Sequence, residues 1–268
     1  METSSAATRT TGIAPTEGVW LRRLSEFIEP TPAELVALEQ AKLTRRTFKR
    51  NELISRQGEC VKEVYFLMNG WVGSSLEVGS GRRQLANILL PGDFAGLPDI
   101  ALKRVAATLV ALSDVAVDVI PLDRLARLFE TAPRFLFMLF VMTQRECVLL
   151  MDQLAMVGQS KAIQRVAALI LHIHRRLSVL QPDIGNVVDW PLSQLRVAEA
   201  VGLTSVHVNR TFRDLTQRGL VARKKGKQIE LLDLDALIRL SGLPERSFAK
   251  EPDWLVNCCS PATGLNRR

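Results

Sequence analysis

The sequence predicts an α+β protein with an N-terminal β-roll (a double-stranded β-helix, or jelly-roll), a long dimerisation helix and a C-terminal winged helix-turn-helix. Three observations support this prediction. Short apolar stretches separated by glycine turns fill residues 50–121, as is typical of a β-sandwich or roll. A long helical pattern follows, with apolar residues three and four apart. Near the C-terminus, a glycine turn joins two short helical patterns, and two short strands follow them.

The chain is basic, and its positive charge is concentrated in one segment. It has 268 residues and a net charge of +7, and 47% of the residues are hydrophobic, which is enough for a sizeable core. Residues 205–227 contain seven arginines and lysines but a single acidic residue, Asp214. This concentration indicates an acidic partner such as nucleic acid, although a run of charge can also be a solvated surface.

Several classes of protein and site are not indicated by the sequence. The longest wholly apolar run, residues 135–142, is far shorter than the roughly 20 residues that cross a bilayer. The N-terminus lacks the features of a secretory signal. The cysteines at positions 60, 147, 258 and 259 do not have the spacing of a zinc or iron–sulfur site. We therefore expect a cytoplasmic protein with no membrane contact, metal or cofactor.

Changes in composition and in the spacing of apolar residues divide the chain into five parts. Helical patterns over residues 21–28 and 32–43 precede the strands, and a Pro- and Gly-containing connection at residues 181–186 marks the boundary of the last domain. The five parts are a flexible N-terminal tail (1–20), the β-roll domain (21–130), the dimerisation helix (131–178), the winged helix-turn-helix (179–244) and a C-terminal tail (245–268).

The long helix carries a seam of apolar and small residues. Pro133 is typical of the first position of a helix, and the seam residues after it alternate in spacings of four and three, like the a and d positions of a coiled coil. This spacing predicts a two-stranded parallel homodimer; the alternative is a helix that packs on its own domain. The seam residues are Leu136, Phe140, Thr143, Cys147, Leu150, Leu154 and Val157.

Residues 193–215 have the pattern of a helix-turn-helix. Ser193 can cap the first helix with its hydroxyl oxygen, and Thr204 can cap the second. Between them, Gly202 permits the left-handed turn that few other residues tolerate. The second helix is expected to direct three side chains into the core, those of Val208, Phe212 and Leu215.

Another face of the second helix carries groups that can read base edges. Arginine can donate two hydrogen bonds to guanine, asparagine can pair with adenine, and valine can contact the thymine methyl group. The face consists of Val206, Asn209, Arg210 and Arg213. Two strands are predicted after this helix, and the turn between them carries Lys225 and Lys227, which are expected to bind phosphates as the wing.

In this order, the three parts resemble the Crp/Fnr family of bacterial transcription regulators over residues 21–243. Leu90–Gly96 (LPGDFAG) is similar to the family's Pro-Gly-Asp-Phe-x-Gly turn, and Ser193–Leu215 is similar to its DNA-reading element. The resemblance implies a homodimer that binds a palindromic site in double-stranded DNA and contacts RNA polymerase, with no enzymatic activity. It also implies four base-contacting positions: Ser205, Val206, Asn209 and Arg210.

The chain departs from the family's DNA-reading pattern at Val206. Many members of the family have a glutamate at this position, which pairs with cytosine in the half-site. Valine cannot accept that hydrogen bond. We therefore expect the half-site to differ from the usual one, whereas Arg210 keeps its role toward guanine.

The residues that bind cyclic nucleotides in responsive members are also incomplete here. Those members continue the glycine turn with Gly-Glu-Leu and then with Arg-Ser or Arg-Thr. This chain has Gly96–Asp99 (GLPD) and Arg104–Ala106 (RVA) instead, and Cys147 and Val148 stand where responders have Thr-Ser. A response to cyclic AMP is therefore not expected.

A pocket for an unknown small-molecule effector is nevertheless a hypothesis for the β-roll. Its candidate residues are Gly96, Arg104 and Cys147. A regulator gated by a cyclic nucleotide or by another small ligand is the alternative function.

Functions from other classes have less support. Residues 44–119 contain no histidine, which argues against a metal-binding cupin, and neither a nucleophile–base set nor a phosphate-binding glycine loop is recognisable. His172 and His174 are two apart on a helix and are expected to be solvated. A third hypothesis is a structural dimer whose basic face binds polyanions without sequence preference.

Overall fold

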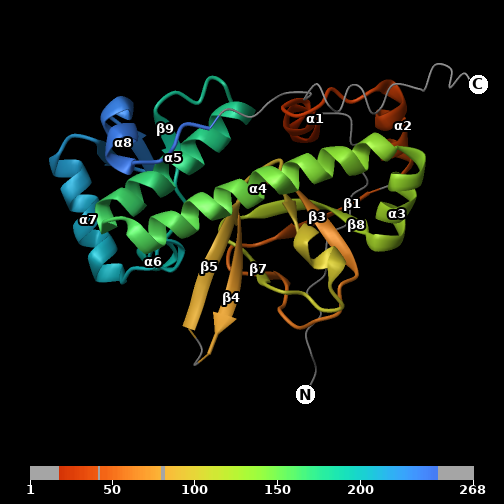
Figure 1. Cartoon of the computed structure of the whole chain (residues 1–268), viewed down its shortest axis with the longest axis horizontal. Helices are drawn as coiled ribbons and strands as arrows, with labels where there is room; N and C mark the ends of the chain where they lie inside the picture. Colours follow the sequence, from red (N-terminus) through yellow and green to blue (C-terminus); the bar gives the residue numbers. More distant parts are fainter. Residues whose placement is uncertain (1–17, 42, 80–81, 247–268) are drawn as a thin grey trace, which may run out of the picture.

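The computed structural model describes residues 18–41, 43–79 and 82–246. A β-roll lies beneath the long helix α4, and a smaller three-stranded domain with its helices lies at the far end of that helix (Figure 1). This arrangement confirms the predicted α+β fold class. Most of the two predicted tails, including Cys258 and Cys259, lies outside the described residues.

The β-roll consists of two four-stranded antiparallel sheets, with strand orders β1-β8-β3-β6 and β2-β7-β4-β5. Alternating side chains from both sheets enclose a core in which Leu67, Val117 and Val119 are almost completely buried. A 3-10 turn, Leu97–Ala101, follows β6. The strands are β1 (Thr44–Phe48), β2 (Leu53–Ser55), β3 (Glu63–Asn69), β4 (Val72–Val78), β5 (Arg82–Leu89), β6 (Phe94–Ala95), β7 (Thr108–Ala111) and β8 (Val115–Pro121).

The first strand begins earlier than the sequence indicated. β1 (TRRTF) has no apolar alternation, so its pattern gave no strand signal. It is held instead by ion pairs, from Arg45 to Asp118 of β8 (2.8 Å) and from Arg46 to Glu63 of β3 (2.5 Å).

Three helices cover one end of the roll: α1 (Val19–Ser25), α2 (Pro32–Gln40) and α3 (Leu122–Thr131). α2 starts with a capping box, in which Thr31 Oγ1 accepts a hydrogen bond from the Glu34 N–H and the Glu34 carboxylate accepts one from the Thr31 N–H (2.6 Å). α1 begins at Val19, so the predicted N-terminal tail of residues 1–20 ends earlier than expected, a difference typical of helix termini.

The segment expected as one dimerisation helix, residues 131–178, contains two helices. α4 (Pro133–Gln159) begins at its proline, as predicted, and α5 (Ala162–Leu180) starts after a break at Ser160 and Lys161. Gly158 weakens the end of α4. Gln164 then stabilises a new helix start, because its side chain accepts a hydrogen bond from the Lys161 N–H (2.9 Å). α5 packs with the C-terminal helices instead of extending α4.

The C-terminal part has the order and connections of a winged helix-turn-helix. Its antiparallel sheet has the strand order β10-β11-β9. The elements are β9 (Val187–Asp189), α6 (Gln194–Val201), α7 (Ser205–Gln217), β10 (Val221–Lys224), β11 (Gln228–Leu231) and α8 (Leu234–Ser241). Among the described helices of the chain, none is both long enough and apolar enough to span a membrane.

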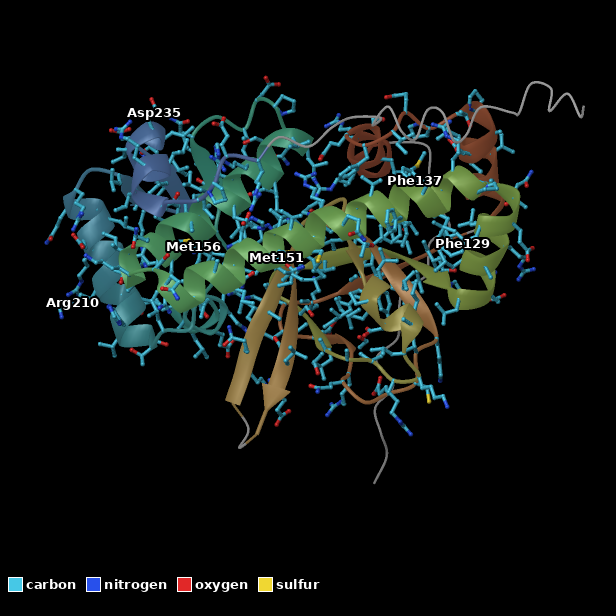
Figure 2. The ribbon with its side chains drawn as sticks, viewed as in Figure 1. Phe129, Phe137, Met151, Met156, Arg210 and Asp235 are labelled. Atoms are coloured by element: carbon cyan, nitrogen blue, oxygen red, sulfur yellow. The ribbon has the colours of Figure 1, made fainter. Side chains whose placement is uncertain are left out.

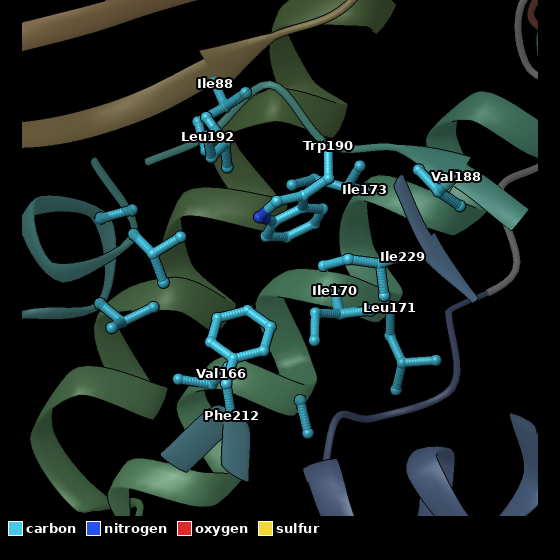
Figure 3. Packing of buried hydrophobic residues seen from close by; sticks show 14 of the residues in the cluster. Ile88, Val166, Ile170, Leu171, Ile173, Val188, Trp190, Leu192, Phe212 and Ile229 are labelled. Carbon is cyan, nitrogen blue, oxygen red and sulfur yellow. The ribbon is translucent and has the colours of Figure 1, made fainter. Parts of the chain in front are cut away.

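The roll and the C-terminal part share one hydrophobic core. The ring centroid of Trp190 lies 6.2 Å from that of Trp71 in the roll and 6.3 Å from that of Phe212 in α7. Figure 3 shows Trp190 above Phe212, with Ile88 of β5 and Leu192 beside it. Because aromatic side chains bury large apolar areas, this packing fixes α7 relative to the roll.

Candidate nucleic-acid interface

The turn between α6 and α7 is built from two helix caps and one glycine, as predicted. Ser193 Oγ accepts a hydrogen bond from the Arg196 N–H (3.3 Å), and Thr204 Oγ1 accepts one from the His207 N–H (3.2 Å). Gly202 has a φ of 66°, in the left-handed region. Both hydroxyls act here as acceptors, so each can still donate its own proton to an incoming acceptor.

One face of α7 is anchored in the C-terminal core. Val208, Phe212 and Leu215 are almost completely buried, as the spacing predicted. Arg223 of β10 covers the Phe212 ring, with its guanidinium carbon 4.7 Å from the ring centroid. These contacts fix the rotation of α7 about its axis.

The opposite face of α7 is open to solvent. The side chain of Val206 is 81% exposed, Arg210 and Arg213 are exposed, and Ser205 and Asn209 are half-buried. Figure 2 shows Arg210 projecting from α7 away from the body of the molecule. Within the described residues, no carboxylate pairs with Arg210 or Arg213. Both guanidinium groups are therefore available to an external acceptor.

The wing is the hairpin of β10 and β11. Its turn consists of Lys225, Gly226 and Lys227, all exposed, and the last two have φ values of 81° and 62°. Positive φ is unusual for lysine, but tight hairpin turns require it. Lys224 pairs with Glu230 across the hairpin (2.7 Å), so the two lysines of the turn carry the charge at the tip.

A buried ion cluster joins the C-terminal part to the roll. Asp93, in the turn between β5 and β6, accepts hydrogen bonds from Arg23 of α1 (2.6 Å), from Arg176 of α5 and from the Leu90 N–H (2.7 Å). Arg176 also donates to the Ile88 carbonyl (2.8 Å). All three charged side chains are buried. Burial alone would raise the pKa of Asp93, but Arg176 and Arg23 hold it below its usual range.

Gly92 makes this cluster sterically feasible. Its φ is 89°, and a Cβ added there would lie 3.0 Å from the Cβ of Arg23. The glycine before Asp93 is thus required both for its backbone conformation and for the close approach of Arg23.

The cluster extends to the long helix α4. Glu26, the residue directly after α1, pairs with Arg23 (2.9 Å) and with Arg145 of α4 (2.5 Å), and Arg176 lies 3.6 Å from Glu146. One connected set of charges therefore links α1, the roll, α4 and α5.

His174 is buried and His172 is half-buried, which corrects the expectation that both histidines of α5 are solvated. His174 is buried, and its Nε2 lies 3.0 Å from the Gly185 carbonyl. His172 Nε2 lies 3.3 Å from Arg176 Nη1, and burial together with the charge of Arg176 lowers the pKa of His172 to about 3. The expectation was wrong because α5 packs against the roll on one side and against the C-terminal helices on another. Little of its surface is therefore left in contact with solvent.

A small cavity lies between the roll and α4. Its volume is about 140 Å³, below the roughly 300–1,000 Å³ of typical small-molecule sites. Gly96 borders it, but Arg104 and Cys147 do not. Arg104 is exposed and donates to the Gly58 carbonyl (2.8 Å), and Cys147 is exposed on α4. The structure does not bring the three candidate pocket residues together.

One carboxyl group that borders this cavity is already bound within the protein. Asp99 accepts a hydrogen bond from the Ala106 N–H (2.8 Å), and burial raises the pKa of Asp99. A cyclic phosphate beside Asp99 would compete for that N–H donor and lie close to a carboxyl group, which disfavours a cyclic nucleotide here. Across the described part of the chain, no group of three His, Cys, Asp or Glu side chains is placed to hold a metal ion.

Comparison with known proteins covers both parts of the chain. The family model of the cyclic nucleotide-binding domain matches residues 45–132, and that of the Crp-like helix-turn-helix domain matches residues 164–240. The nitrogen fixation regulation protein FixK of Bradyrhizobium diazoefficiens is 30% identical over 202 residues, which cover 75% of this chain and 83% of that protein. The chain belongs to the Crp/Fnr family of transcription regulators.

Further Crp/Fnr proteins agree with this assignment. The transcriptional activator protein FnrA of Stutzerimonas stutzeri is 25% identical over 209 residues, or 78% of this chain and 85% of that protein. The solved structure of FixK2 from Bradyrhizobium japonicum has a TM-score of 0.69 at 25% identity and covers 76% of this chain and 99% of its own. The Crp/Fnr resemblance that the two motifs predicted is thereby confirmed.

The ion cluster of Asp93, Arg23 and Arg176 is not predicted from the sequence. The LPGDFAG motif contains Asp93, but Arg23 and Arg176 lie 70 and 83 residues away from it. One signal was available: Arg176 lies on the apolar face of α5, three residues after Ile173 and four before Leu180. A cation in such a position is rarely buried without a partner.

We predict that the substitution Asp93→Asn destabilises the protein by about 3–5 kcal/mol, because it removes the counter-ion that two buried arginines share. Urea unfolding followed by circular dichroism would measure the change. The control is Asp123→Asn, which removes the same charge from an exposed pair with Arg127. Equal losses in the two variants would show that the cluster does not stabilise the fold.

Proposed function

We propose that this Crp/Fnr regulator is a homodimer that binds a palindromic site in double-stranded DNA and reads its bases with α7. The observation that carries the proposal is the two-sided character of α7, with one face anchored in the core and Val206, Arg210 and Arg213 exposed on the other. A helix of this kind suits the major groove, which admits an α-helix and displays a distinct pattern for each base pair.

Each exposed group of α7 has a chemically matched base partner. Arg210 can donate two hydrogen bonds to the O6 and N7 of guanine, and Asn209 can pair with adenine. Val206, with no polar atom in its side chain, suits a thymine methyl group, so the half-site at this position would differ from one read by glutamate. Ser205 and Arg213 flank these groups and can contact bases or the adjoining backbone.

Phosphate contacts are assigned to the wing and the helix caps. Lys225 and Lys227 place two positive charges at the tip of an exposed turn, where they would bind phosphates regardless of sequence. Ser193 and Thr204 lie at the N-termini of α6 and α7, where backbone N–H groups and hydroxyl protons favour an anion.

The exposed face of α4 supports the dimer. Six of the seven seam residues are exposed and Val157 is half-buried; among them Leu154 is 75% exposed. A contiguous apolar stripe of this length marks an interface, and a second α4 packed on it would form the predicted parallel pair. The stripe also argues against the alternative in which α4 packs only on its own domain.

The remaining parts of the proposal follow from the sequence and the family. The domain limits are a β-roll over residues 21–130, the dimer helix within 131–178 and the winged helix-turn-helix over 179–244. The protein would act in the cytoplasm without enzymatic activity, contact RNA polymerase and respond to a signal through a shift in population between two arrangements of its recognition helices. The lack of fit in the roll cavity argues against cyclic AMP as that signal.

We predict that Arg210→Ala weakens binding to the specific duplex by about 1–3 kcal/mol and relaxes the preference at one base position. The loss on random duplex should be much smaller, because a base contact adds little to nonspecific binding. Fluorescence anisotropy with the two duplexes would measure both affinities. If Arg210→Ala lost affinity for both duplexes equally, α7 would not read bases.

The wing provides the matched comparison. Lys225→Ala removes one positive charge, as Arg210→Ala does, but should weaken specific and random duplexes alike and reduce the dependence of binding on salt concentration. A base preference altered by Lys225→Ala would contradict the assignment of the wing to phosphates.

We predict that Leu154→Glu raises the dissociation constant of the dimer at least about tenfold, because two glutamates would be desolvated close together in the interface. Sedimentation equilibrium would measure the change. Leu102→Glu, at an exposed leucine of the roll (48% exposed), is the control and should leave the dimer intact. A dimer that is insensitive to Leu154→Glu would exclude the α4 seam as the interface.

A further inference from the structure

A second and larger cavity lies away from the roll cavity, where α4 meets α5 and α6. Its volume is about 400 Å³, within the range of roughly 300–1,000 Å³ that small-molecule sites occupy. One wall comes from α4 and the residues directly after α1, and the other from α5, α6 and the residues after α8. Any ligand held there would contact both parts of the molecule.

Much of the lining is apolar. The apolar lining residues of α4 and α5 are Leu149, Met156 (Figure 2), Val157, Ala168, Leu169 and Val179. Of the seam residues on α4, Val157 alone also borders this cavity. Apart from Val157, the cavity and the proposed dimer contact involve different residues of α4.

The polar part of the lining has an excess of positive charge. Its two carboxylates are already neutralised within the protein: Glu26 by Arg23 and Arg145, and Asp152 by Arg246 (2.6 Å).

Two arginines at the cavity have no acidic partner. Arg165 donates to the carbonyls of Ser160 (2.9 Å) and Val201 (3.4 Å), and Arg175 borders the cavity from the same helix. Within the residues that the structure describes, no carboxylate pairs with either one. A guanidinium group beside apolar walls matches a planar carboxylate attached to an apolar body, because it can donate two parallel hydrogen bonds to the carboxylate oxygens.

We propose that the cavity between α4, α5 and α6 binds an organic carboxylate with an apolar body, with Arg175 holding the carboxylate. A ligand in this position stabilises the arrangement in which the roll and the winged helix-turn-helix are packed together, by mass action. Its role as an effector of DNA binding rests on the function proposed above, whereas the binding site itself does not.

Calorimetric titration of the full-length protein with decanoate tests the site. One decanoate is expected to bind per chain. Decanol, which has the chain without the charge, and acetate, which has the charge without the chain, are each expected to bind at least about tenfold more weakly. Failure of the wild-type protein to bind decanoate, or equal binding of decanol, would overturn the proposal.

Two variants localise the binding. Arg175→Gln should weaken decanoate binding about tenfold or more, whereas Arg56→Gln, which removes the same charge from an exposed position in the roll, should not. Val179→Trp, at a residue that is 39% exposed at the cavity, should block binding by filling the entrance without disturbing the core. Unchanged binding in both Arg175→Gln and Val179→Trp would place decanoate elsewhere and overturn the proposal.

The effect on DNA separates this inference from the proposed function. Specific duplex binding is measured with and without saturating decanoate, for the wild type and for Val179→Trp. A shift in duplex affinity that Val179→Trp abolishes supports the effector role. Decanoate binding with no shift in duplex affinity would overturn that role. Duplex binding without decanoate binding removes this inference alone, and decanoate binding without duplex binding removes the proposed function alone.

Discussion

The arrangement of the whole molecule depends on one buried carboxylate. Asp93 lies in a tight turn of the roll and neutralises two buried arginines, one from α1 and one from α5. Asp93 is the one carboxylate that both buried arginines share, and the desolvation of a charge is costly unless it is paired. The same turn needs glycine at position 92, because a larger residue there would collide with the side chain of Arg23. The Pro-Gly-Asp sequence is therefore the point at which the roll, the N-terminal helix and the C-terminal part are joined.

Two further contacts fix the position of the recognition helix, α7, relative to the roll. Trp190 fills the space between Trp71 of the roll and Phe212 of α7, and Arg145 extends the ion cluster onto α4. A change at the roll or at α4 would thus be transmitted to α7 through packed aromatic rings and paired charges, which are discrete contacts that either form or break. α4 also carries the apolar seam. In a dimer, the ion cluster and the Trp190 packing would therefore set the position of each recognition helix relative to its counterpart.

The sequence predicted the local features well because they depend on residues close together in the chain. The caps at Ser193 and Thr204, the glycine turn at Gly202 and the buried face of α7 each follow from spacings of a few residues. The seam on α4 was predictable for the same reason. The ion cluster was not, because Arg23, Asp93 and Arg176 are far apart in sequence and only the tertiary fold brings them together. The break between α4 and α5 is not predicted by apolar spacing, because apolar residues resume directly after it, at Ala162 and Ile163. The grouping of Arg104 and Cys147 with Gly96 follows a family pattern whose geometry this chain does not share.

Selection of binding sites from a random duplex pool with the purified wild-type protein, followed by sequencing, tests the central claim most directly. The account predicts enrichment of a two-fold symmetric sequence whose half-sites are centred about one helical turn apart, roughly 34 Å, with a guanine in each half-site for Arg210 and no requirement for the cytosine that glutamate would read opposite Val206. Enrichment of no sequence, or of single half-sites without a fixed spacing, would contradict a dimer that reads DNA with α7.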